Sequence, residues 1–387
     1  MERIIRTEIS KVYITALDTY EESAVGAVLC PLLDGMLADN GIEKGTLAGK
    51  NVVLKPNLLA KREADAGITT HPSFMIAAAK YFLSLGAAVI IADSPGGVYN
   101  KASLEGIYKT TGMKYAAEVS GASLNFDTSS ERVLRKELSK NAFPLIKPLI
   151  DADLIVNLNR LKTHALCQMS ASVKNLYGSI PGLAKAEYHA LFPTRDGFAD
   201  MLCDLCLVNA PQINITDGVL GMEGNGPAGG TLRKVGCVIA SANPFAADIA
   251  ASYIMGYKPD EVGTVKCAVK RGLCPKDVNG LTIVGESPDK FACSFKRPDA
   301  SAGGLVGQLP TIFGGKLRKW MEPRPTVDKH KCVGCGECAR NCPVSTIRII
   351  DKKANIDPSA CIKCYCCHEF CPAKAIKVKS RLIFKHK

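Results

Sequence analysis

Two cysteine runs with identical spacing lie in the C-terminal part of the chain. The first reads KCVGCGECARNCP from Lys331, and the second reads ACIKCYCCHEFCP from Ala360. In each run three cysteines recur at every third position, and a fourth follows after three further residues and precedes a proline. Three thiolates with this spacing can wrap one face of a cubane iron–sulfur cluster. The spacing therefore predicts two [4Fe-4S] clusters as cofactors.

The fourth ligand of each cluster has to come from outside its three closely spaced cysteines. In two-cluster modules with this spacing, the last cysteine of each run binds the other cluster. The predicted ligand sets are therefore Cys332, Cys335, Cys338 and Cys371 for one cluster, and Cys361, Cys364, Cys367 and Cys342 for the other. Cys366 lies outside the pattern. We interpret it as a packed thiol, with substitution for a neighbouring ligand as the alternative.

Zinc ribbons and a disulfide framework are the rival interpretations of these cysteines. Zinc sites usually take their four ligands from two separated pairs, whereas each run here offers three close cysteines and a fourth before proline. Disulfide frameworks are typical of short secreted chains, but this chain has 387 residues and begins MERIIRTE, which lacks the apolar stretch of a signal peptide. Iron–sulfur clusters fit better than either rival.

Residues 326–380 resemble the bacterial 2[4Fe-4S] ferredoxin module. The resemblance rests on the eight matched cysteines and on Pro343 and Pro372, which close the two runs. It implies a small α+β domain in which short strands at 344–350 and 375–378 flank the clusters.

The net charge of +12 points at first to an anionic partner. Two oxidised clusters with their thiolates would carry roughly −2 each, which leaves about +8. Basic residues outnumber acidic ones by 13 to 5 from residue 327 onward, so this charge either balances the clusters or steers an acidic redox partner protein. No stripe of alternating basic and aromatic residues supports binding to nucleic acid.

The cysteine content indicates a reducing compartment, because nine of the 17 cysteines crowd the cluster runs and must remain thiolates. No apolar run reaches the eighteen residues or so that a membrane span needs. We expect a cytoplasmic protein of an anaerobe or facultative anaerobe.

The rest of the chain alternates strands and helices. Continuous apolar runs predict buried strands, and apolar residues at helical spacing predict helices between them. The predicted strands are 11–17, 51–57, 87–93, 153–159, 212–218, 234–241 and, more weakly, 281–284; the predicted helices are 19–38, 72–85, 170–178, 195–208 and 244–255. This order predicts an α/β domain with a large, mostly parallel sheet and helices on its faces. We place this domain at 1–296, a linker rich in Gly, Pro and basic residues at 297–326, and the small iron–sulfur domain at 327–387.

Polar residues collect where the predicted strands end, and in open α/β sheets ligands bind beyond those carboxyl ends. Such a crevice would suit an anion or a carbonyl group and would have acid–base capacity. The catalytic candidates are Lys162, His164, Lys55, Asp217 and Glu223, and the candidates for binding a further cofactor are Asn57, Asn159, Lys174 and Asn175. Asp93 and Ser94 follow another strand, and His71 and His189 are further titratable candidates. Each lysine could instead be a solvated loop charge, and each histidine an ordinary cap.

Two further patterns have structural explanations. Residues 224–229 match G-x-G-x-x-G, but Pro227 interrupts the loop and a strand follows where a dinucleotide site needs a helix. We interpret 218–230 as a flexible Gly-rich lid that brings Asp217 and Glu223 to the crevice. Cys203 and Cys206 lie within an apolar helix, where core packing explains them.

The chain as a whole resembles the uncharacterised DUF362 family with its common C-terminal ferredoxin module. The motifs that carry the resemblance are NVVLKPN, THP at 70–72, NLNRLKTH, SVKNLYG and TDGVLGMEGNGP. The resemblance supports the domain layout and the strand-end candidates, but it implies no particular reaction.

Two functions follow from these patterns. In the first, the protein is an iron–sulfur oxidoreductase that passes electrons to a small-molecule substrate or cofactor in the crevice. In the second, it is a ferredoxin-type electron carrier whose α/β domain only docks a partner. Several titratable groups in one crevice favour the first.

The cysteine pattern makes a chemical prediction. Protein reconstituted without oxygen should contain about eight irons and about eight acid-labile sulfides per chain. Cys342→Ser and Cys371→Ser should each damage the cluster bound mainly by the opposite run, as followed by electron paramagnetic resonance, while the control Cys366→Ser should leave both signals unchanged. Stoichiometric zinc without charge-transfer absorption would contradict the assignment.

Overall fold

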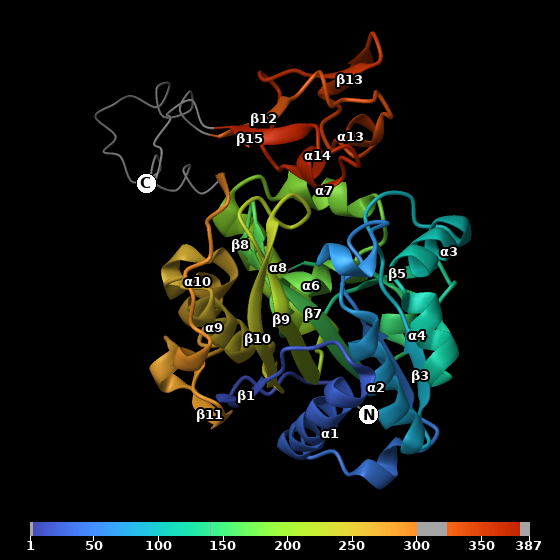
Figure 1. Ribbon diagram of the computed structural model, residues 1–387, viewed down its shortest axis with the longest axis vertical. Coiled ribbons are helices and arrows are strands. Elements are labelled where there is room, and N and C mark those ends of the chain that lie inside the picture. The colour runs from blue at the N-terminus through green and yellow to red at the C-terminus, as the bar shows by residue number, and fades with distance from the viewer. Residues whose placement is uncertain (1–2, 140, 300–322, 380–387) are drawn as a thin grey trace.

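The structure is a computed structural model that describes residues 3–139, 141–299 and 323–379. A large α/β domain comprises the first two ranges, and a small module comprises the third and lies against one end of the large domain (Figure 1). Most of the predicted linker at 297–326 falls outside the described residues. No helix in the described ranges is long and apolar enough to span a membrane.

The large domain is built on one mixed, mostly parallel sheet, as predicted. Among the described residues nine strands form it, in the order β11-β1-β10-β9-β7-β2-β3-β4, with β8 paired to β7. Their bounds are β1 Lys11–Ala16, β2 Asn51–Lys55, β3 Ala88–Ile91, β4 Ser123–Leu124, β7 Leu154–His164, β8 Gln168–Ser170, β9 Ile213–Glu223, β10 Thr231–Ser241 and β11 Thr282–Gly285. From β9 through β7 and β2 to β4 neighbouring strands are parallel, and β10 runs antiparallel between β9 and β1.

Helices cover both faces of this sheet (Figure 1). The longer helices are α1 Glu22–Asp39, α2 Pro72–Ser84, α3 Lys101–Thr110, α4 Met113–Ser120, α7 Ala184–Leu191, α8 Arg195–Asn209, α9 Pro244–Ile254 and α10 Gly263–Lys270. Alternate strand residues divide between the two layers: Val238 packs in the core of α1 and α2, whereas its neighbours Cys237 and Ile239 pack with α9. Burial on both faces explains why the central strands are nearly continuous apolar runs.

Three helices begin with local signals that fix their position. Asn243 caps α9 by accepting hydrogen bonds from the amides of Phe245 and Ala246, and Thr194 caps α8 in the same manner. Proline follows the cap in α2 and α9, where its fixed φ suits a first helical turn and its missing N–H costs nothing.

Two strands extend well past their predicted ends. β7 continues to His164, so the predicted loop after residue 159 is strand, and β9 continues to Glu223, so the first part of the predicted flexible lid at 218–230 is strand as well. The reason is pairing: Lys162 lies opposite Met222 of β9 and Ser170 of β8, and the end of β9 pairs with the start of β10. Only residues 224–230 form a turn. The predicted helix at 170–178 is a single turn, α6 Ser172–Asn175, followed by a 3₁₀ turn at Leu176–Ser179.

The small module has two similar halves. β12 Arg324–Val327 pairs with β15 Ile376–Lys379, and β13 Ile347–Ile350 pairs with β14 Lys353–Ile356. One helical turn accompanies each cysteine run, α13 Glu337–Arg340 and α14 Cys366–Glu369. The strands predicted at 344–350 and 375–378 are present in shortened or shifted form as β13 and β15.

The module packs against the large domain through α14 and its flanks. Tyr365 and Val378 are buried in the same apolar cluster as α8. The Phe370 ring lies over Gly96, where an ideal Cβ would come within 2.0 Å of its Cε1 atom. Arg62 donates a hydrogen bond to the carbonyl of Cys371 across the boundary, at 3.3 Å. Glycine at position 96 is therefore required by the approach of the module.

This contact predicts the effect of a side chain at position 96. Gly96→Val should push Phe370 away and increase backbone hydrogen exchange at 365–371, because two more methyl groups cannot fit beside the ring. Gly26→Val is the matched control, since no atom lies within 4 Å of its Cβ position. Phe370→Ala added to Gly96→Val should restore slow exchange. Unchanged exchange in Gly96→Val would show that the two parts do not pack in this way.

Candidate functional site

The cysteines of the module divide into two groups around two small cavities. One cavity is lined by Cys332, Cys335, Cys338 and Cys371, and the other by Cys342, Cys361, Cys364 and Cys367. Each group combines three cysteines of one run with the last cysteine of the other, which is the arrangement that two cubane clusters require. Backbone amides also point at the sulfurs: those of Ala354 and Ala375 lie 3.3 Å from Cys332 Sγ and 3.2 Å from Cys371 Sγ.

The spacing within each group suits a multi-iron cluster. Each cavity is lined by four cysteines, the number that one cubane cluster needs, and backbone amides approach the sulfurs. The residues present therefore fit [4Fe-4S] clusters, which would supply one-electron transfer when bound.

The two cysteine groups differ in one exposed residue. Cys335 is exposed, and its neighbour Val333 keeps 67% of its surface in contact with solvent, whereas Cys332 and Cys338 of the same group are buried. In the other group Cys367 is buried, and the adjacent Cys366 is also buried. Cys366 lines the second cysteine cavity and also a larger cavity that lies between the module and the large domain.

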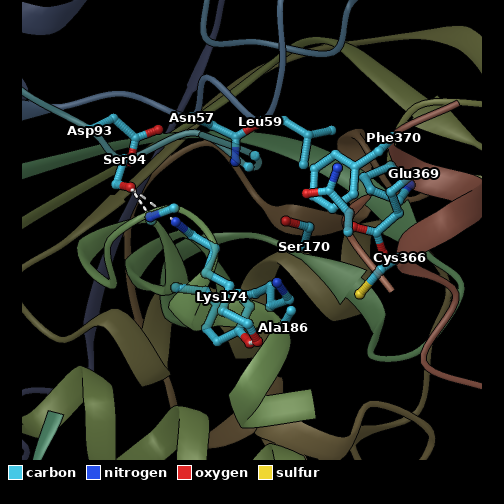
Figure 2. Close-up of a pocket in the computed structure, with 18 of the residues that line it drawn as sticks. Asn57, Leu59, Asp93, Ser94, Ser170, Lys174, Ala186, Cys366, Glu369 and Phe370 are labelled. Carbon is cyan, nitrogen blue, oxygen red and sulfur yellow. Dashed lines mark hydrogen bonds between the residues drawn. The ribbon is translucent and has the colours of Figure 1, made fainter. Parts of the chain in front are cut away.

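This interdomain cavity is where the strand-end residues and the module meet. It has a volume of about 70 Å³, room for several waters or a small ligand. Asp93 and Ser94 lie at one end, whereas Leu59, Phe370, Glu369 and Cys366 lie at the other, with Lys174 between them (Figure 2). Of the nine residues predicted as catalytic or cofactor-binding, Asn57, Lys162, His164, Lys174 and Asn175 line it.

Lys162 enters the cavity from β7 and is fully buried. Its Nζ donates hydrogen bonds to Asn57 Oδ1 at 2.6 Å and to the carbonyl of Ile68 at 2.5 Å. No described carboxylate lies within ion-pair distance of it. Burial, and then the positive charges of Arg160 and Lys174, lower the pKa of Lys162 to about 7. The ammonium can therefore give up a proton near neutral pH.

A ladder of amide side chains holds the acceptor of Lys162 in place. Asn57 Nδ2 donates to Asn175 Oδ1, and Asn175 Nδ2 donates to Asn157 Oδ1, both at 2.8 Å. α6, which carries Asn175, is itself anchored by the buried Asp248, whose carboxylate accepts the amides of Ser172 and Val173 at 2.7 and 3.2 Å. The ladder links β2, β7 and α6 at the base of the cavity.

His164 joins the large domain to the module. Its Nδ1 accepts hydrogen bonds from the amides of Leu166 and Cys167 at 3.1 and 3.3 Å, so the proton belongs on Nε2. Nε2 lies 3.2 Å from Glu369 Oε1. Burial lowers the pKa of His164 well below its usual range, and burial raises the pKa of Glu369 to about 7. A neutral imidazole, with its proton on Nε2, therefore faces the Glu369 carboxyl without a well-aligned hydrogen bond, because Glu369 Oε1 has no hydrogen-bond partner among the described residues.

Two more lysines reach the cavity from the segment after β8. Lys174 Nζ lies 4.3 Å from the centre of the Tyr177 ring, and no described residue forms a hydrogen bond or ion pair with it. Lys185 Nζ donates to Ser94 Oγ at 3.1 Å and also contacts the carbonyls of Pro95 and Ile180. Burial lowers the pKa of Lys185 to about 7.

Four predicted residues lie outside the lining of this cavity. Lys55 lies behind Asp93 and forms a fully buried ion pair with it at 2.7 Å. Asn159 donates to Ser172 Oγ and to the carbonyl of Ile215. The other two are engaged in ion pairs of their own: Asp217 pairs with Arg160 at 3.1 Å, and Glu223 pairs with Arg233 at 3.0 Å.

The two further histidine candidates differ in position: one lines the cavity and the other does not. His189 lines the cavity, stacks on Phe198 with ring centres 4.4 Å apart, and has its pKa lowered to about 3 by burial. His71 stacks on Tyr20, 3.8 Å away, and does not line the cavity.

Lys185 and Glu369 are the charged lining residues that sequence reasoning missed. Lys185 lies in α7, a helix that the sequence analysis did not predict. Glu369 falls inside the second cysteine run, where only the cysteine spacing was interpreted. A carboxylate flanked by apolar and aromatic residues in the sequence HEFCP was the available signal for a buried acid.

The buried ammonium of Lys162 predicts a pH dependence of stability. Its pKa is about 7 in the folded protein and near 10.5 in the unfolded chain, so the cost of burying its charge is full below pH 7 and disappears as the pH rises toward 10.5. The melting temperature of Lys162→Met, relative to wild type, should therefore fall as the pH is raised from 7 to 10. The exposed Lys109 on α3 provides the control Lys109→Met, whose difference from wild type should stay constant. A constant difference for Lys162→Met as well would show that Lys162 is not held neutral.

Family models match both parts of the chain. Residues 52–253 match the family described as "Domain of unknown function (DUF362)". Residues 324–372 match the family described as "4Fe-4S dicluster domain". The first match spans the β2–α9 region that lines the cavity, and the second contains all eight predicted cluster cysteines.

One curated relative is similar over most of its length. It is the "Thylakoid-associated protein sll1697" from Synechocystis sp., 30% identical over 269 residues, which are 69% of this chain and 81% of that protein. Among solved structures, the lactate racemase apoprotein from Thermoanaerobacterium thermosaccharolyticum is similar with 12% identity and a TM-score of 0.38. That alignment covers 64% of this chain and 58% of the racemase chain, and a likeness this weak supports no conclusion about fold or function.

The two family matches cover the motifs around the cavity and the paired cysteine groups, and the curated relative is similar over most of the same chain. The chain belongs to the DUF362 family and carries a C-terminal 4Fe-4S dicluster domain, which implies a role in electron transfer.

Proposed function

We propose that the protein is an iron–sulfur oxidoreductase in which electrons pass between the dicluster domain and a small molecule bound in the interdomain cavity. The observation that carries this proposal is the position of Cys366, whose side chain lines both the interdomain cavity and the cavity of the second cysteine group. A molecule in the interdomain cavity would be separated from the cluster ligands by little more than this residue.

The lining residues can supply the protons that accompany electron transfer. Lys162 is poised to donate a proton near pH 7, because its pKa is lowered to about 7 and Asn57 fixes the direction of its ammonium group. His164 presents Nε2–H on the module side of the cavity and is oriented by two backbone amides. Both residues belong to β7, the strand that pairs with β2, β8 and β9, which favours a rigid arrangement.

The exposed Cys335 suggests the side of the module at which electrons enter or leave. Cys335 is the one exposed cysteine of the two groups, so a redox partner protein would approach the first group there. Described charges at 328–353 comprise six lysines and arginines against three carboxylates, which favours an acidic partner. The other group lies toward the cavity. A plain carrier would have no need of a fully buried lysine without a carboxylate partner, Lys162, beside two half-buried lysines at this cavity.

The proposal is tested by single-turnover kinetics. The compound retained by protein purified without oxygen is identified by mass spectrometry, and the dithionite-reduced protein is then mixed with it. Lys162→Met and His164→Gln should reduce normally with dithionite and keep wild-type cluster spectra, because neither residue belongs to the cysteine groups. Their reoxidation by the compound should be slower by on the order of a hundredfold, the usual contribution of a positioned acid–base group.

Lys109→Met serves again as the control and should reoxidise at the wild-type rate. If Lys162→Met and His164→Gln also reoxidise at that rate, the cavity is not where the reaction occurs. The carrier function, in which the α/β domain only docks a partner, then replaces the oxidoreductase.

A further inference from the structure

We propose that the interdomain cavity binds a small organic oxyanion, with its carboxylate or phosphate group held between Lys174 and Lys185 and its carbon end against Leu59 and Phe370. This assignment rests on the proposed function only in treating the bound anion as the substrate. Binding of the anion itself follows from the charge, hydrogen bonds and shape of the cavity.

The charges around the cavity do not balance. Lys162, Lys174 and Lys185 line it, and Lys55 lies directly behind Asp93. Against these four lysines stand two carboxylates, Asp93 and Glu369, so the formal excess is two positive charges. Asp93 is already paired with Lys55, and Glu369 faces His164. Lys162 is fully buried and Lys174 and Lys185 are half-buried. Cations with so little solvent and no counter-ion are costly, and an anion of one or two charges would offset them.

Lys174 is the best placed of these lysines to hold an anion. It lies on α6, which the Asp248 carboxylate anchors through two backbone amides. Its ammonium has the Tyr177 ring on one side, and no described residue accepts a hydrogen bond from it. Three N–H groups are therefore free to donate to a ligand.

Lys185 and Ser94 complete the anion end of the cavity. Ser94 Oγ accepts hydrogen bonds from Lys185 Nζ at 3.1 Å and from the amide of Gly182 at 2.8 Å. Among the described residues none accepts a hydrogen bond from the Ser94 hydroxyl, so this group can donate to an oxyanion beside the Lys185 ammonium. A carboxylate or phosphate with several lone pairs suits such convergent donors.

The opposite end of the cavity carries two large apolar side chains beside the Glu369 carboxyl. Leu59 and Phe370 face it there, next to Cys366 and away from Ser94 (Figure 2). A ligand whose oxyanion lies at Ser94 would therefore place its carbon chain against these two side chains. In this orientation the uncharged carbon chain of the ligand, and not its oxyanion, would lie nearest to the dicluster domain.

Isothermal titration calorimetry of the holoprotein without oxygen tests the assignment. The probes are acetate and butyrate for the carboxylate group, and inorganic phosphate and butyl phosphate for the phosphate group. At least one pair should bind saturably, with the longer member tighter by on the order of tenfold, because added methylene groups leave water. The pair that binds tells a carboxylate site from a phosphate site.

The variants separate a built site from general attraction to a basic protein. Lys174→Met should weaken binding by at least about tenfold, Lys174→Arg should largely preserve it, and Lys109→Met should leave it unchanged. Lys185→Met is the second test of the same site, should Lys174→Met alter the cluster spectra. Absence of saturable binding by all four probes, or equal binding by wild type, Lys174→Met and Lys185→Met, would overturn the assignment.

The result also distinguishes the two proposals. One outcome is that an anion binds in a Lys174-dependent manner, but no anion of the same chemical class changes the rate at which the reduced protein is reoxidised. In that case the binding assignment stands and the oxidoreductase function fails. If a neutral compound reoxidises the protein in a Lys162-dependent manner while no anion binds, the oxidoreductase function stands and the oxyanion assignment fails.

Discussion

Several positive charges are held in a buried space at the carboxyl end of the sheet, and much of the surrounding structure serves to keep them there. An ammonium removed from water is costly unless hydrogen-bond acceptors or opposite charges replace the lost hydration. Lys55 is compensated by Asp93, and Lys162 by one amide oxygen and one backbone carbonyl. The amide ladder through Asn175 and the anchor at Asp248 fix those acceptors at the cost of burying further polar groups. Such an arrangement is expected where a site, rather than stability, sets the requirement.

The dicluster domain completes this buried space instead of sitting apart from it. Tyr365 packs into the core of the large domain, Phe370 closes onto Gly96, and Glu369 meets His164. All three residues belong to the second cysteine run or its immediate flank, so the segment that provides cluster ligands also provides one wall of the cavity. The second cysteine run therefore contributes both to binding a cluster and to closing the cavity of the large domain.

The sequence predicted the apolar parts of the fold well and the polar parts less well. β2 and β3 were recognisable because strands buried on both faces are continuous apolar runs. β7 was predicted only to residue 159, since RLKTH reads as a loop when its partners in β8 and β9 are unknown. The cysteine grouping could be predicted because three ligands of each cluster follow a local spacing rule, and the fourth follows from the presence of two such runs. Lys185 and Glu369 could not be placed, since their meeting depends on packing between two parts of the chain that share no local pattern.

One wall of the cavity has no freedom to change. At Gly178 an added Cβ would lie 2.0 Å from Asp93 Oδ1 and 2.6 Å from Lys55 Nζ, so the backbone itself covers this ion pair and any side chain there would break it. At the opposite end the cavity is bounded by side chains, among them Leu59 and Phe370, and not by backbone that covers an ion pair. Proteins built on this plan can therefore diverge in the size of the molecule they accept more readily at that end, while the charged side stays the same. Selectivity for the carbon skeleton and recognition of the anionic group would then evolve independently.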